Sequence, residues 1–153
     1  MNNEFITTIE YLKGLLESDT ALEMVTHGVS QNIDLDKKGN YPLAHIQCMS
    51  FNPMYQMGMI SFMFEIHILK IRDTSKQPSN DKWQRNDNEL VNYNDTINIA
   101  NRLFAKLKNL NDNDIEVVSQ TSPEILTLEF MNMLDGCRFQ LELAITNQVD
   151  GCA

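Results

Sequence analysis

Apolar residues recur at helical spacing in two stretches of the chain. Residues 4–17 and 90–110 each carry hydrophobic side chains at steps of three and four, which predicts two amphipathic helices. Asp87 or Asn88 is expected to cap the second helix. The two stripes are Phe5, Ile9, Leu12 and Leu16, widened by Ile6 and Leu15, and then Leu90, Tyr93, Ile97, Ala100, Leu103, Phe104 and Leu107.

Alternation of apolar and polar residues predicts three strands, at 41–50, 59–71 and 115–120. Asn52-Pro53 is expected to end the first strand. The second strand is the longest, and the residues on one of its faces should be core: Ile60, Phe62, Phe64, Ile66 and Ile68. Residues 21–40 have no clear period, because the helix formers at the start of this stretch are soon interrupted by Gly28.

The end of the chain predicts a β-hairpin. Residues 124–134 and 137–145 both have strand character, and Asp135-Gly136 lies between them. Asp-Gly suits a type I′ turn, in which both central residues have positive φ. The inward side chains of the second arm should be Phe139, Leu141, Leu143 and Ile145.

The order of these elements predicts an α+β fold, a mostly antiparallel sheet with two helices packed on one face. A length of 153 residues, 42% of them hydrophobic, fits a single domain over residues 1–153 that folds without a disulfide or a metal. Within this domain we expect a long loop at 72–89 and a loose tail at 147–153.

The loop at 72–89 is unusual for a compact domain. It is polar, has no helical or strand period, and is longer than most structureless connections. Trp83, the single tryptophan, lies within it. Two interpretations remain open: the loop folds back over the sheet as a lid, or Trp83 anchors a neighbouring subunit, since tryptophan is enriched at interface hot spots.

The second face of the strand at 59–71 mixes apolar and polar residues, too apolar for open solvent and too polar for a dry core. Methionines are also frequent near it, either as flexible core filling or as an adaptable contact surface. These methionines are Met49, Met54, Met57, Met59 and Met63, with Met131 and Met133 later in the chain. The candidate contacts with other subunits or partners are Met59, Met63, Glu65, His67 and Trp83.

Catalytic chemistry is not indicated. His45, His67 and Glu65 could approach each other as metal ligands, but a pair two apart on a strand is common by chance. Cys48 and Cys137 have no evident base, and no glycine pattern predicts a phosphate site. We therefore expect no enzyme activity, no catalytic or metal-binding residues and no cofactor. The odd count of three cysteines and the absence of a signal pattern predict reduced thiols in a cytoplasm. No apolar run reaches the length of a membrane span.

The chain is acidic, with 21 Asp and Glu against 12 Lys and Arg and a net charge of −9. This sign argues against groove binding to nucleic acid, which requires cations to displace phosphate counterions. Two interpretations remain: the charge keeps the protein in solution, or it lines a wall that DNA passes without sticking.

Three local patterns resemble a known family. They are the helix Ile6-Thr7-Thr8-Ile9-Glu10-Tyr11-Leu12-Lys13; the run Tyr41-Pro42-Leu43-Ala44-His45-Ile46, followed by a long strand and a polar loop with Asn86-Asp87-Asn88-Glu89; and the closing run Glu129-Phe130-Met131-Asn132-Met133-Leu134-Asp135-Gly136-Cys137. Over residues 4–146 the chain resembles the tail-terminator or tail-completion (neck) proteins of tailed bacteriophages. Similar proteins tend to have an aromatic residue after the glycine, where this chain has Cys137.

The resemblance implies a tail-terminator-like fold and a structural role in the virion. It implies a homo-oligomeric ring, commonly of six copies, at the junction of tail and neck. Such a ring ends growth of the tail tube, binds the tube and the head connector, and lets DNA through without specific binding. The expected location is the virion, after assembly in the bacterial cytoplasm, with no membrane partner. Two alternatives stay open: another phage connector, such as a head-completion or tail-tube protein, or a small cytoplasmic ligand-binding domain.

Overall fold

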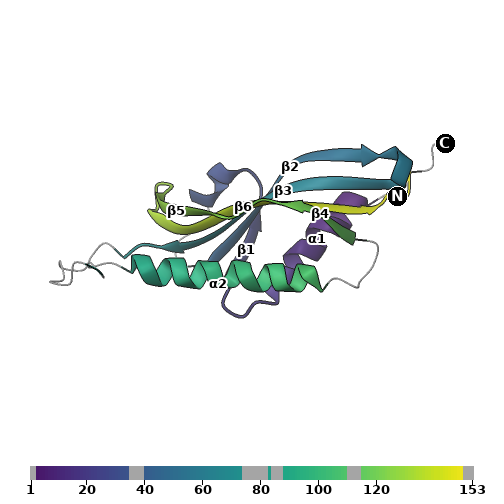
Figure 1. Cartoon of the computed structure of the whole chain (residues 1–153). Coiled ribbons are helices and arrows are strands. Elements are labelled where there is room, and N and C mark those ends of the chain that lie inside the picture. Colours follow the sequence, from purple (N-terminus) through teal and green to yellow (C-terminus); the bar gives the residue numbers. More distant parts are fainter. Residues whose placement is uncertain (1–2, 35–39, 74–82, 84–87, 110–114, 150–153) are drawn as a thin grey trace.

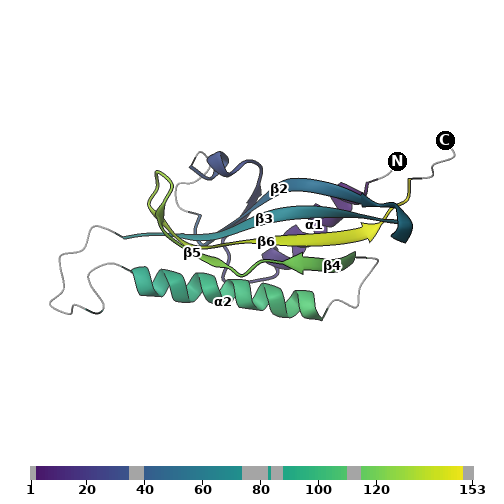
Figure 2. The same ribbon diagram turned by 45° about the horizontal axis from the view of Figure 1, so that its top comes forward.

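The computed structural model describes residues 3–34, 40–73, 83, 88–109 and 115–149. In this part of the chain a six-stranded sheet carries two helices on one face (Figures 1 and 2). The elements are α1 (Glu4–Glu17), β1 (Met24–His27), the 3-10 helix η1 (Ser30–Asp34), β2 (Leu43–Met54), the 3-10 helix η2 (Tyr55–Met57), β3 (Met59–Ile71), α2 (Glu89–Lys108), β4 (Ile115–Gln120), β5 (Glu124–Glu129) and β6 (Leu134–Thr146).

The strand order is β1-β2-β3-β6-β4, and β5 pairs with another part of β6. Only β1 and β2 run parallel; every other pair is antiparallel. The predicted α+β class with a mostly antiparallel sheet is confirmed. The parallel strand β1 was not predicted, because its few residues follow a run of helix formers and gain their place from pairing with β2 far along the chain.

The helix-facing side of the sheet forms the main core. Phe64, Ile66 and Ile68 of β3 are completely buried there, as predicted, and Leu141 and Leu143 of β6 join them. Leu12 and Leu16 of α1 pack onto this surface, whereas Phe5 and Ile6, in the first turn of the helix, are 39% and 49% exposed. The first turn of α1 is therefore only partly covered.

The buried face of α2 is turned relative to the predicted stripe. Leu90 and Ile97 are exposed, and the buried residues are Asn92, Thr96, Ile99, Ala100, Leu103 and Leu107. Asn92 and Thr96 tolerate burial because they are hydrogen-bonded: the Asn92 amide donates to the Ile71 carbonyl at 3.0 Å, and the Thr96 hydroxyl donates to the Asn92 carbonyl at 2.8 Å. A pattern of apolar residues does not reveal these two positions, because both side chains are polar. The Asn88 side chain makes no capping bond and instead accepts from the Asp73 N–H.

The predicted turn at Asp135-Gly136 is wrong. Both residues lie inside β6, paired with Lys70 and Leu69 of β3, and the chain turns earlier, over residues 130–133. Gly136 is needed for close approach, since a Cβ there would lie 1.9 Å from the Ile68 carbonyl oxygen. Asp135 is fully buried and paired with Arg72.

The prediction that Asn52-Pro53 ends the first strand is also wrong. β2 continues to Met54, and Pro53 lies opposite Ile60. Proline is tolerated because β2 is the outer strand at this point, so the missing N–H removes no internal ladder bond. The register shifts between Cys48 and Ser50, and this bulge determines which side chains face the helices beyond it.

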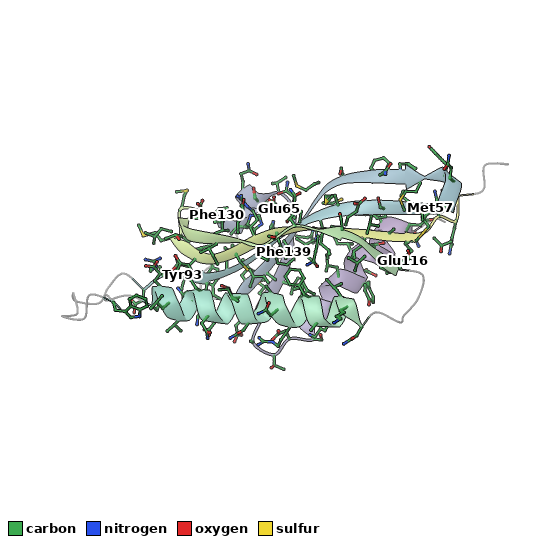
Figure 3. The ribbon with its side chains drawn as sticks, viewed as in Figure 1. Met57, Glu65, Tyr93, Glu116, Phe130 and Phe139 are labelled. Atoms are coloured by element: carbon green, nitrogen blue, oxygen red, sulfur yellow. The ribbon has the colours of Figure 1, made fainter. Side chains whose placement is uncertain are left out.

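A second, smaller core lies on the opposite face of the sheet, at the end where β5 folds over it. Ile33 of η1, Leu43, Leu69, Leu126 and Leu134 form it. Figure 3 shows Phe130 on this side, away from α2, and Phe139 on the side of the helices, where its ring lies 4.8 Å from that of Phe104.

Candidate interaction surface

The sheet is longer than the helices that cover it. β3 has 13 residues and α1 has 14, yet a strand rises about 3.4 Å per residue and a helix about 1.5 Å. The far end of the β2–β3 hairpin therefore extends past the first turn of α1 (Figure 2). Its apolar residues are left exposed: Phe51 is 66%, Met57 65% and Tyr55 85% accessible.

A groove of about 570 Å³ lies at this end, between the hairpin, the start of α1 and residues 147–149. We call it the tip groove. It is mainly apolar, and its walls include Phe5, Cys48, Phe51, Pro53, Tyr55, Ile60, Phe62 and Val149. Two contacts fix the walls of the tip groove. The Asn147 N–H donates to the Gly58 carbonyl at 2.8 Å, and the centroids of the Phe5 and Phe62 rings are 5.5 Å apart.

The bulge in β2 creates the tip groove. Met49 is the extra residue between Cys48, opposite Phe64, and Ser50, opposite Met63. Beyond it, Phe51 lies opposite Phe62 and so faces the helices, where an unbulged strand would have turned it to the other face. The sequence signal for this surface was present in Phe51 and Tyr55, but ending the strand at Asn52-Pro53 hid it.

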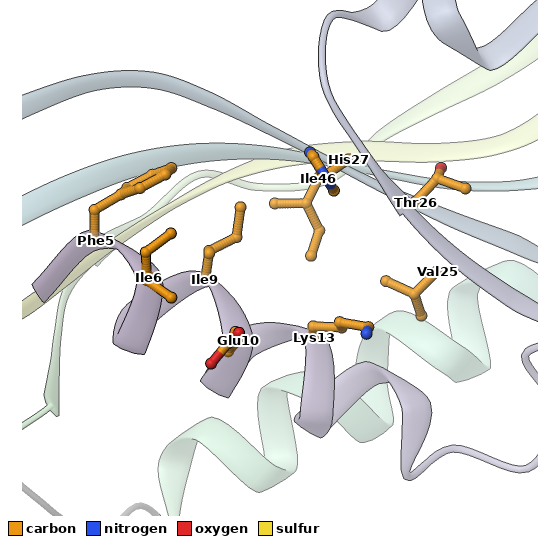
Figure 4. Close-up of a pocket in the computed structure, with 9 residues that line it drawn as sticks. All are labelled: Phe5, Ile6, Ile9, Glu10, Lys13, Val25, Thr26, His27 and Ile46. Atoms are coloured by element: carbon orange, nitrogen blue, oxygen red, sulfur yellow. The ribbon is translucent and has the colours of Figure 1, made fainter. Parts of the chain in front are cut away.

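A second groove, of about 380 Å³, lies between α1 and β1 (Figure 4). Ile6, Ile9, Val25 and Ile46 line its walls, and Glu10, Lys13 and His27 lie around it. We call it the helix groove. Phe5 lines both grooves, so apolar surface follows the first turns of α1 on either side.

Four of the five predicted contact residues share one face of β3, and Trp83 lies outside that strand. Met59 and Met63 are half-buried on β3, opposite Thr146 and Glu142 of β6. Glu65 lies in a polar cleft with Arg138 and Gln140, on the side of the sheet away from α2 (Figure 3). His67 lies next to Glu65 on the same face of β3, with its Nε2 atom 3.7 Å from Glu65 Oε1.

His67 is covered by its own chain, being 2% exposed with the Phe130 ring 5.8 Å away, so it offers no accessible contact in the monomer. Sequence alternation put it on the outer face of β3 but did not show that the turn before β6 folds over that face. Trp83, by contrast, is 81% exposed. The lid interpretation also depends on residues 74–82 and 84–87 of this loop, and these lie outside the described residues.

The two buried histidines are neighbours on adjacent strands. His45 lies opposite His67, with ring centroids 6.4 Å apart. His45 Nε2 donates to the Gly28 carbonyl at 3.0 Å, which leaves Nδ1 to accept from the Thr26 hydroxyl at 2.8 Å. Burial, followed by electrostatic repulsion from His45 when that ring is protonated and from Arg138, lowers the pKa of His67 to about 4. His67 is therefore a neutral imidazole near neutral pH.

Reactive groups do not converge in the described part of the chain. Among these residues no group of three or more His, Cys, Asp or Glu is arranged to hold a metal ion. Burial raises the pKa of the Cys137 thiol to about 12, and the pKa of the exposed Cys48 thiol is also raised. Neither thiol is activated as a nucleophile, because the reactive form is the thiolate.

The methionines support the contact-surface interpretation. Within the described residues none belongs to the buried core, and Met49, Met57, Met131 and Met133 are 47% to 88% exposed. Core filling therefore does not describe these four exposed methionines, whereas Met54, Met59 and Met63 are half-buried. Their long unbranched side chains suit a surface that adapts to a partner.

Among the described helices, none combines the length and the hydropathy that crossing a membrane requires. Compared with known proteins, the chain matches no family model and no curated protein.

Proposed function

We propose that the chain is a structural protein of a tailed-bacteriophage virion. It forms a homo-oligomeric ring, of six copies, at the junction of tail and neck. There it ends growth of the tail tube and joins the tail to the head connector. The protein acts through protein contacts, without a cofactor, and DNA passes through the ring without specific binding.

The observation that carries the proposal is the exposed apolar tip of the β2–β3 hairpin. Phe51, Tyr55 and Met57 are each at least 65% exposed beside an apolar groove. Monomeric proteins rarely leave contiguous apolar surface uncovered, and aromatic residues and methionine are enriched in interfaces. Apolar side chains at the hairpin tip are explained if a partner protein covers them in the assembled state.

Two further features agree with a structural role. Burial favours the neutral imidazole of His67 and the protonated thiol of Cys137, as in a packed interior. The net charge of −9 disfavours retention of DNA in a channel, because like charges repel. The resemblance over residues 4–146 supplies the specific location in the virion.

The helix groove favours a second candidate, a small ligand-binding domain. Its apolar walls and volume of about 380 Å³ are of a size that holds a small molecule. A further phage connector, such as a head-completion or tail-tube protein, would use the same tip surface as a tail terminator.

Electron microscopy of the purified protein separates these candidates. The proposal predicts ring-shaped particles with an open centre, which attach to the end of a tail tube. Particles of single-domain size that retain a small apolar molecule through purification would contradict the ring and support the ligand-binding candidate. Long tubes in place of rings would indicate a tail-tube subunit.

A further inference from the structure

Two strand edges are open at the same end of the sheet. β1 pairs with β2 only over residues 43–46, and no described strand pairs with the outer edge of β2 from Cys48 to Met54. β4 ends the sheet on the other side (Figure 2). Its residues from Glu116 to Gln120 are all exposed. Open edges present unpaired N–H and C=O groups that can pair with another chain.

Charged residues give these edges little protection. The stretch from Cys48 to Met54 has no charged residue, and β4 has one, Glu116. Edge strands are commonly blocked by charges, proline or bulges. Here Pro53 lies next to the end of its strand, and the bulge in β2 turns Phe51 toward the tip groove. β4 has a bulge of its own between Val117 and Ser119, so the two edges match in having one extra residue each. Both edges remain suited to pairing over several residues.

Residues that pair across β2, β3, β6 and β4 form rows that cross the sheet. Each row ends in one residue on the open edge of β2 and one on the open edge of β4. One row runs through Phe51, Phe62, Leu143 and Val117, and a second through Cys48, Phe64, Leu141 and Gln120. Paired residues point to the same face, so Phe51 and Val117 both lie on the helix-facing side. They are 66% and 37% exposed. If a second copy continues the sheet without a shift, Phe51 lies opposite the partner's Val117.

Strand direction also repeats correctly. The four strands at this end, β2, β3, β6 and β4, alternate in direction because each neighbouring pair is antiparallel. Since four is an even number, β2 of a second copy placed beside β4 again runs antiparallel to it, with the helices of both copies on the same side. The contact joins two different edges, so it is head to tail and propagates from copy to copy.

We propose that a second copy of this chain binds here, with its β4 pairing to the open edge of β2 and its Val117 covering Phe51 at the tip groove. This pairing is the seam of the ring proposed above and rests on that proposal. It makes one continuous antiparallel sheet from the sheets of neighbouring copies. The tip groove is then closed by apolar side chains of the neighbour.

A disulfide across the seam tests the pairing. In a Cys152→Ser background, Gln120→Cys places a thiol on the row of the native Cys48, and paired strands bring the two Cα atoms within about 4.4–6.8 Å, the distance a disulfide spans. Mild oxidation should link successive copies into a covalent ladder that reductant dissolves. Adding Cys48→Ser should abolish the ladder. Asn98→Cys, at an exposed position on α2, should give none.

Charge substitution gives an independent readout. Phe51→Asp and Val117→Lys, both at exposed positions, should each raise the dissociation constant of the ring by about tenfold or more, because each places a charge in an apolar contact. Mixing the two variants should restore assembly, since Asp on one edge then meets Lys on the other. Circular dichroism checks that both variants remain folded.

The outcomes separate this pairing from the ring itself. If the unmodified protein forms rings, but Gln120→Cys gives no ladder and both charge variants assemble normally, the seam lies elsewhere and the ring proposal stands. If the unmodified protein stays monomeric at every concentration, both proposals fall. A ladder that requires Cys48, together with rescue by mixing, establishes the seam.

Discussion

Arg72 and Asp135 form a buried ion pair that joins the end of β3 to the start of β6. Arg72 Nη2 lies 2.7 Å from Asp135 Oδ1, and the Asp135 side chain is completely buried. The Leu128 N–H and the Asn92 amide also donate to this carboxylate, at 3.0 and 3.1 Å. One carboxylate therefore connects β3, β5, β6 and α2.

Removing this carboxylate should destabilise the domain strongly. Asp135→Ala removes the buried partner of Arg72, whose side chain is 5% exposed, and leaves its contact with the partly exposed Glu89 at 3.1 Å. We expect the free energy of unfolding to fall by about 3–5 kcal/mol, measured by urea denaturation. The matched control is the exposed pair of Arg138 and Glu124: Glu124→Gln should cost less than about 1 kcal/mol. Equal effects of the two substitutions would contradict the buried-pair account.

The close approach at Gly136 gives a second test. Gly136→Ala forces a Cβ toward the Ile68 carbonyl oxygen and should lower the free energy of unfolding by roughly 2 kcal/mol or more, because backbone must move. Gly14→Ala is the control: nothing lies within 4 Å of that Cβ, and Gly14 is in the middle of α1. It should stabilise the protein by about 1 kcal/mol. If Gly136→Ala left the free energy of unfolding unchanged, residue 136 would lie in a turn and not within β6.

His67 predicts a loss of stability in mild acid. Its pKa is about 4 in the folded protein and 6.5 when unperturbed. Between these values the unfolded chain binds a proton that the folded chain does not, so stability is complete above pH 6.5 and declines as pH falls toward 4. The full loss is about 3 kcal/mol, at 1.36 kcal/mol per unit.

The comparison with His67→Gln isolates this effect from other titrating groups. Urea denaturation across pH 4–7.5 should show the stability of the native protein falling more steeply than that of the variant. Parallel curves would show that His67 is not held neutral by burial.

Trp83 reports on assembly. Its side chain is 81% exposed, and it is the single tryptophan, so its fluorescence is assigned without ambiguity. If it anchors a neighbouring subunit, its emission maximum should move to shorter wavelength when the protein assembles, because the indole leaves water. An emission maximum that is the same in free and assembled protein would rule out this role.

Much of the fold is predictable from local pattern. α1, β3 and β4 begin and end where the sequence places them, and the reason is clearest for α1, with its helical stripe, and for β3, with its unbroken alternation. The errors come from contacts that are distant in sequence. Asp135-Gly136 has the composition of a turn, but the ion pair with Arg72 and the close approach to Ile68 place it within a strand.

The interaction surface was less predictable than the fold. Pro53 indicates a strand end by composition, and only the edge position of β2 shows why the strand tolerates it. The tip groove needs the bulge at Met49, which sequence alternation cannot distinguish from an ordinary change of face. His67 was expected at the surface because the fold-back of Phe130 has no local signal.

Native mass spectrometry of the purified protein at tens of micromolar tests the central claim, assembly into a ring, most directly. The account predicts a species with six times the mass of the chain, without bound metal or ligand. A monomer at every concentration, or a dimer that carries a tightly held ligand or metal, would contradict it.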